Sequence, residues 1–131
     1  MTAQRTKYGR GNAGVAAFNG TYAPLLETVY VQGTAGTAQT INLANGSIQD
    51  FTASAASCAF TMPTAVAGQS FVWRFHQDGT GGRAVTWVGT IEWPGGAAPT
   101  LTPTASAKDV VSFTCITAGT WEGFPAGYDM R

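Results

Sequence analysis

After residue 39 the chain consists mostly of short runs in which apolar and polar residues alternate. In the strongest run, residues 70–77, the side chains of Phe71, Trp73 and Phe75 fall on one face of a strand, because successive strand residues point to opposite sides. The run 108–116 alternates in the same way, with Val111, Phe113 and Cys115 on one face. Weaker runs, each bounded by turn residues such as Gly, Pro or Asn-Gly, predict further strands at residues 40–43, 48–52, 58–62, 84–88 and 90–93.

The spacing of these runs predicts an all-β fold, since strands that recur every ~8–12 residues are typical of a β-sandwich or β-barrel. One polar face per strand favours antiparallel sheets, and the Gly-rich turn 78–82 predicts a hairpin between residues 70–77 and 84–88. No helical pattern of useful length is present, and the Ala-rich stretch 53–59 is expected to be a loop or a bent strand. We therefore expect an antiparallel, jelly-roll-like β-sandwich.

The first 38 residues differ from the rest of the chain. Arg5, Lys7 and Arg10 supply three of the seven Lys and Arg residues, and no acidic residue precedes Glu27. Residues 24–31 are apolar and predict a short extended piece. This segment is either a solvated tail or an arm that docks on a neighbouring subunit. The expected organisation is an extended N-terminal arm (1–38), a β-sandwich domain (39–124) and a C-terminal tail (125–131).

Composition favours a protein that is covered by neighbours in an assembly. The formal net charge of the 131 residues is zero and only 11% of them are charged, against roughly 25% in an average soluble domain. A freely soluble monomer generally has a charged surface and a net charge away from zero. The lack of a basic excess argues against nucleic-acid binding. No apolar run approaches the ~20 residues of a membrane helix, and we expect no signal peptide.

The residues that could carry chemistry do not form a recognisable catalytic or metal site. The single histidine, His76, lies on the polar face of its strand and is interpreted as a surface or interface residue. The turn at Asp78 lacks the Lys-Ser/Thr of a phosphate-binding loop. The seven acidic residues are scattered, so nothing in the sequence favours the carboxylate pair of a glycosidase. We expect no enzymatic activity, no metal and no cofactor.

Two cysteines and two tryptophans remain open to more than one interpretation. Cys58 and Cys115 lie on apolar strand faces, and could be buried free thiols, an intramolecular disulfide or an intermolecular cross-link. Trp73 and Trp121 are expected in the core. Trp87 and Trp93 lie near turns and are the better candidates for contact with a glycan or a partner.

Several stretches of the sequence resemble a β-domain that recurs in virion proteins of tailed bacteriophages, notably head-decoration and tail-fibre proteins. The resemblance lies in residues 61–71 and 77–87, followed by IEWPGG (91–96), APTL (98–101), DVVSF (109–113) and GTW (119–121). It extends over about residues 39–124 and includes no catalytic motif. It implies a β-sandwich or jelly-roll module, often trimeric, that adheres to a capsid, a tail or a host glycan.

Within that group, a short chain with an arm and no heptad shaft resembles a capsid decoration, or cement, protein. The resemblance implies a homotrimer on the capsid exterior that binds the major capsid protein. The residues expected at the capsid or subunit contact are Arg5, Lys7, Arg10, Leu25, Leu26, Val29 and Tyr30. The alternative is a tail- or head-fibre adhesin that binds a host surface glycan through Trp87 or Trp93.

Overall fold

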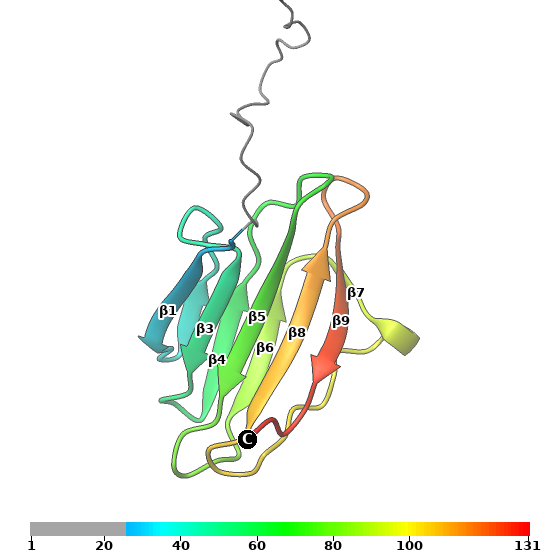
Figure 1. Cartoon of the computed structure of the whole chain (residues 1–131). Coiled ribbons are helices and arrows are strands. Elements are labelled where there is room, and N and C mark those ends of the chain that lie inside the picture. Colours follow the sequence, from blue (N-terminus) through cyan, green and yellow to red (C-terminus); the bar gives the residue numbers. More distant parts are fainter. Residues whose placement is uncertain (1–25) are drawn as a thin grey trace, which may run out of the picture.

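In the computed structural model, the described part of the chain, residues 26–131, contains nine strands in two sheets (Figure 1). The larger sheet has the order β1 (Val29–Thr34), β3 (Ile48–Thr52), β5 (Ser70–His76), β8 (Lys108–Thr114), β9 (Trp121–Gly127) and β7 (Ile91–Glu92). The smaller sheet has the order β2 (Ala38–Thr40), β4 (Ser57–Thr61) and β6 (Ala84–Val88). A short 3₁₀ turn, η3 (Pro94–Gly96), is the one helical element among these residues. The all-β class is confirmed, and the two layers are compatible with a β-sandwich.

The sheets are mixed, which corrects the antiparallel arrangement expected from the sequence. Strands β1, β3 and β5 run parallel, as do β2, β4 and β6, whereas β8 is antiparallel to β5 and β9. From β1 to β6 the chain crosses to the other sheet after every strand. The mixed sheets do not confirm the expected jelly roll.

The hairpin predicted between residues 70–77 and 84–88 is wrong, because β5 and β6 belong to different sheets. Backbone groups around the connecting loop bond to distant segments instead of closing a hairpin. The amide of Gln77 donates to Ala107, and that of Ala84 donates to Ala56. These bonds direct the chain away from β5 into the second layer.

The core lies between the two layers and is rich in aromatic rings. Phe60 of β4 is fully buried and contacts the rings of Phe51, Trp73 and Phe75 at centroid distances of 4.9–5.9 Å. The alternation predicted for β5 is confirmed, since Phe71, Trp73 and Phe75 are all buried. Edge-to-face contacts of this kind add specificity to the burial of apolar area.

Two predicted boundaries need correction, because β1 lies within the expected arm and β9 extends into the expected tail. Strand β1 pairs with β3 along its length, so the described sheet begins at Val29 and not after residue 38. Strand β9 continues to Gly127, past the boundary at 124. Weak local patterns hid both strands: β1 is interrupted by a register shift before Gly33, and β9 contains Pro125.

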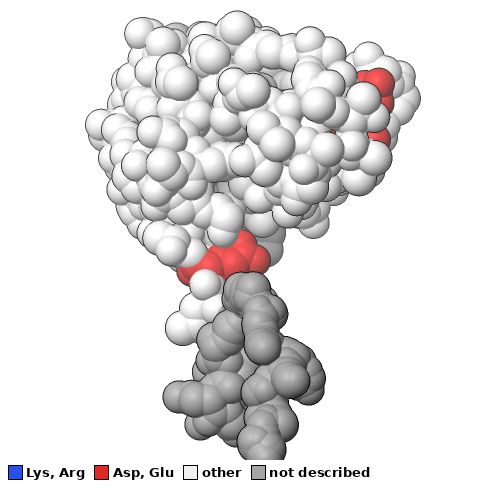
Figure 2. Space-filling view, turned by 90° about the horizontal axis from the view of Figure 1, so that it is seen from above, with Lys and Arg blue, Asp and Glu red and all other residues white. Residues whose placement is uncertain are grey.

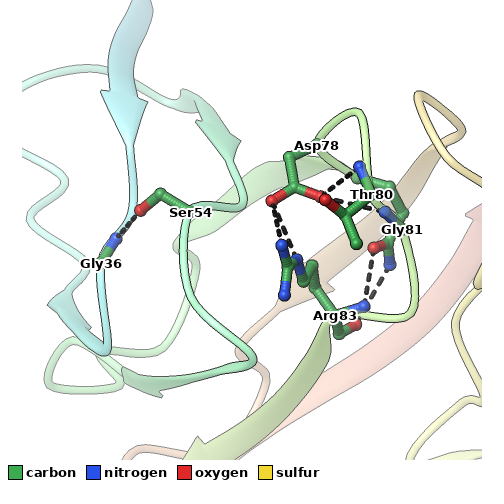
Figure 3. A network of polar contacts seen from close by, with 7 residues as sticks. Gly36, Ser54, Asp78, Thr80, Gly81 and Arg83 are labelled. Atoms are coloured by element: carbon green, nitrogen blue, oxygen red, sulfur yellow. Dashed lines mark hydrogen bonds and ion pairs between the residues drawn. The ribbon is translucent and has the colours of Figure 1, made fainter.

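The loop between β5 and β6 is held by one carboxylate (Figure 3). Asp78 Oδ1 accepts hydrogen bonds from the amides of Thr80 and Gly81, each at 3.0 Å. Asp78 Oδ2 accepts from the Arg83 guanidinium at 2.8 Å. Chiefly because of the Arg83 hydrogen bond, the pKa of Asp78 falls to about 2 and that of Arg83 rises. The loop is therefore a fixed turn between the two sheets, in place of the expected hairpin turn, and its Asp78 is ionised at neutral pH.

Candidate interaction surfaces

Exposed apolar side chains gather at one end of the two-layer fold. Strands β1, β3 and β5 begin at this end and β8 finishes there (Figure 1). The carbonyl of Val88, at the end of β6, accepts from the amide of Met62, at the start of the loop that leads into β5. We call this region the apolar end and define it by four exposed side chains, Leu26 (89% exposed), Val66 (51%), Val88 (50%) and Ile116 (66%).

The loops of the apolar end are fixed to one another by backbone hydrogen bonds. The amide of Gly68 donates to the carbonyl of Cys115, and the amide of Cys115 donates to Gln69. A further bond joins the amide of Gly119 to the carbonyl of Ala65. These bonds leave the side chains of Val66 and Ile116 on a surface that is organised without a partner, which reduces the entropy lost on docking.

Charge is distributed unevenly between the two ends. Among the described residues, the view onto the apolar end shows no Lys or Arg, and acidic side chains appear at only two places (Figure 2). Within residues 26–131 the basic residues lie elsewhere: Arg83 precedes β6, Lys108 begins β8 and Arg131 follows β9. Arg74, the fourth, pairs with Asp50 on β3. A charge-poor apolar surface of this kind is typical of the centre of a protein–protein interface.

The residues that the sequence predicts at the capsid or subunit contact divide into two groups. Arg5, Lys7, Arg10 and Leu25 lie outside the described residues. Leu26 belongs to the apolar end, and Val29 is 51% exposed on edge strand β1. Tyr30 is half-buried on the opposite face of that strand, where its hydroxyl donates to the Gln32 side chain. Val66 and Ile116 could not be predicted from the sequence, because their loops meet only in the fold.

Trp87 and Trp93, the candidates for glycan contact, are half-buried and pack against the core. Their ring centroids are 5.5 Å apart, and both rings contact Phe113. Trp73 and Trp121 are fully buried, as expected. Trp93 also lines an open hollow at the edge of the larger sheet.

Both cysteines are free thiols buried in the core, Cys58 in β4 and Cys115 just after β8. Of the three alternatives, the structure therefore contains the buried thiols and not the intramolecular disulfide. Burial raises the pKa of the Cys58 thiol, which disfavours the reactive thiolate.

His76 takes part in a charged cluster on the outer face of the larger sheet. The register of β3 and β5 places Asp50 opposite Arg74 and next to His76. Asp50 carboxylate oxygens lie 3.3 Å from Arg74 Nε and 3.1 Å from His76 Nε2. Asp50 is thereby partnered although it is only 9% exposed. The cluster gives His76 a structural partner within the sheet.

Within residues 26–131, no three His, Cys, Asp or Glu side chains come together in a way that could hold a metal ion. No helix in the same range has the length and hydrophobicity to cross a membrane. Comparison with known proteins found no matching family model, no matching curated protein and no matching solved structure.

Proposed function

We propose that this chain is a bacteriophage virion structural protein, a decoration protein that binds across major capsid subunits on the capsid exterior. The observation that carries the proposal is the apolar end, where Leu26, Val66, Val88 and Ile116 are exposed and no Lys or Arg of residues 26–131 is in view. The described chain also begins at this end, so the basic sequence before Leu26 is joined to it there. Docking would bury these side chains and bring the basic segment to the same partner. The resemblance to phage virion β-domains supports the same assignment.

The proposed mechanism is stabilisation by binding. A copy that docks through its apolar end over a junction buries surface on more than one capsid subunit. Separation of those subunits then loses these contacts, and a ligand that binds only the assembled state stabilises that state by mass action. Association of the copies as a trimer, the state expected from the resemblance, would multiply weak contacts through avidity.

The first experiment locates and counts the chain in purified virions by quantitative gel and particle imaging. We expect hundreds of copies spread over the head. A handful of copies at the tail or at one vertex would contradict the proposal and favour the fibre adhesin. Analytical ultracentrifugation of the isolated chain tests the trimer separately.

Two kinds of variant test the docking surface itself. Deletion of residues 2–28 removes the basic segment and stops before β1, which begins at Val29. The substitutions Val66→Asp and Ile116→Asp place a charge on the apolar end. Tyr128→Asp is the control, because Tyr128 is 47% exposed just after β9, at the opposite end. We expect the first three variants to lose capsid binding while staying folded. Binding of Val66→Asp and Ile116→Asp as tight as that of Tyr128→Asp would show that another surface docks.

A further inference from the structure

An open hollow of about 370 Å³ lies where short strand β7 leaves the edge of β9. Strand β7 pairs with β9 over only two residues before the chain turns away at η3. Beyond that point the edge of β9 is uncovered by β7. The hollow is lined by Glu92, Trp93, Pro94, Glu122, Gly123 and Phe124.

Two carboxylates line the hollow from neighbouring strands. Glu92 and Glu122 are direct register partners in the parallel pair β7–β9, and register partners project to the same face of a sheet. Neither carboxylate forms an ion pair or side-chain hydrogen bond with residues 26–131. Like charges in this relation repel each other, and no basic side chain of residues 26–131 forms an ion pair with either of these two.

The other walls of the hollow are apolar. Phe124, two residues beyond Glu122 on the same face of β9, is 47% exposed. The Trp93 ring lies against the backbone of Gly123, where a Cβ would be 2.4 Å from Trp93 Cζ3. Further contacts with Trp87 and Phe113 hold the ring from the core side. The site therefore combines a fixed indole, an exposed phenyl ring and two carboxylates.

We propose that this hollow binds the alkylammonium group of a lysine side chain on a protein partner. The ammonium would lie between the carboxylates of Glu92 and Glu122 and relieve their repulsion. The methylene stem would pack on Phe124 and on the part of half-buried Trp93 that lines the hollow. An anionic ligand would add to the repulsion, and a neutral sugar would leave it in place. The proposal is independent of the decoration function, because no lining residue belongs to the apolar end.

The test uses Nα-acetyl-lysine methylamide as the probe and its uncharged analogue, Nα-acetyl-norleucine methylamide, as the matched control. Both are titrated into the ¹⁵N-labelled full chain, and the Trp93 indole signal and the Gly123 and Phe124 amides are followed by NMR. We expect the lysine probe to shift these signals with a Kd of about 1–10 mM, and the norleucine probe to bind at least about tenfold more weakly. Equal binding of the two probes would overturn the proposal. So would shifts with methyl glucoside but not with the lysine probe, which would indicate a sugar site.

Variants connect the binding to the named residues. We expect Glu92→Gln and Glu122→Gln each to lower the affinity for the lysine probe about three- to tenfold, since each removes a charge and keeps an oxygen acceptor. Trp93→Phe keeps a ring in place, so it should lower the affinity for the lysine probe less than Trp93→Leu does. The same spectra report whether each variant is folded. Unchanged affinity in both glutamine variants would refute the role of the carboxylates.

The chain itself contains one lysine outside the described residues, Lys7, which could supply the same group. The Lys7→Gln variant distinguishes this source from a partner. If the spectrum of the hollow without a probe is unchanged by Lys7→Gln, the site is available to a partner lysine, as we propose. If the signals of Trp93 and Phe124 shift and the probe binds more tightly, the chain's own lysine is the occupant and the partner assignment is wrong.

Discussion

The indole of Trp93 lies directly against the backbone of Gly123, so that a Cβ on Gly123 would stand 2.4 Å from Trp93 Cζ3. Gly123→Ala must therefore displace the ring from its contacts with Trp87 and Phe113. We expect a loss of about 1–3 kcal/mol in the free energy of unfolding, as for other overpacked sites, measured by chemical denaturation. Gly79→Ala, where a Cβ meets nothing within 4 Å, is the control. A loss that persists in a Trp93→Leu background would show that the ring is not its cause.

Two adjacent glycines in the loop before β6 allow the cost of backbone strain to be measured separately from the cost of steric overlap. Gly81 and Gly82 have φ of 76° and 69°. A Cβ on Gly81 would lie 2.5 Å from the Pro103 carbonyl oxygen, whereas one on Gly82 meets nothing within 4 Å. We expect Gly82→Ala to cost about 1–2 kcal/mol through φ alone, and Gly81→Ala to cost about 1–3 kcal/mol more. Equal losses in denaturation experiments would contradict the close approach to Pro103.

The Asp78–Arg83 contact predicts a specific dependence on pH. The pKa of Asp78 falls from 3.8 to about 2 on folding, so its ionised form stabilises the fold above the unfolded pKa. This contribution is lost as pH falls from about 4 through about 2. We expect Asp78→Asn to lower Tm at pH 7, and its difference from the wild type to shrink over that range.

The matched control for this prediction is Asp129→Asn, which breaks the exposed ion pair with Arg131. Exposed pairs contribute little to stability, so its Tm should stay close to that of the wild type. A Tm difference for Asp78→Asn that is independent of pH would mean that packing, and not ionisation, accounts for its effect.

Glu122→Gln should stabilise the fold, because it removes the repulsion between register partners Glu92 and Glu122. The expected gain is about 0.2–1 kcal/mol, and it should shrink in about 1 M salt, where exposed charges are screened. Glu27→Gln is the comparison: Glu27 accepts a hydrogen bond from Ser47 at 2.7 Å, so no gain is expected there. A destabilised Glu122→Gln variant would show that the carboxylate has a stabilising partner.

The buried thiols predict slow chemical modification. Cys58 and Cys115 are 2% and 0% exposed, so a thiol reagent such as DTNB should react with neither in the native protein on the time scale of a free thiol. Both should react at once in denaturant. Rapid modification under native conditions, or a covalent dimer on a non-reducing gel, would contradict the burial of these side chains.

The positions of β3 to β8 could be predicted from the sequence, whereas β1 and β9 fell in the expected arm and tail and the partners of the strands could not be predicted. Alternation at Phe71, Trp73 and Phe75 identifies β5 and its buried face, and this information is local. The direction of strand pairing is not encoded locally, because a parallel and an antiparallel strand show the same alternation. It depends on distant backbone contacts such as the bond from Ala84 to Ala56, which have no sequence signal.

The two candidate surfaces illustrate the same limit. Leu26 and Val29 could be predicted as contact residues because they lie in the largely apolar stretch 24–31, which leads into β1. Val66 and Ile116 come from loops that meet only through the bonds between residues 65–69 and 115–119. Glu92 and Glu122 become neighbours only because β7 pairs with β9, and no spacing in the chain indicates that pair.

The alternation of strands between the two sheets has a consequence for how the chain folds. Among the strands of residues 26–131, only β8 and β9 pair with a neighbour in sequence. Every other pair must close a longer loop before any contact compensates for the lost chain entropy, and non-local topologies of this kind fold in about milliseconds to seconds. Central strand β5 forms backbone hydrogen bonds with β3 on one edge and with β8 on the other. Any fragment that ends before Lys108 therefore leaves β5 with an unpaired edge, and such edges are open to aggregation.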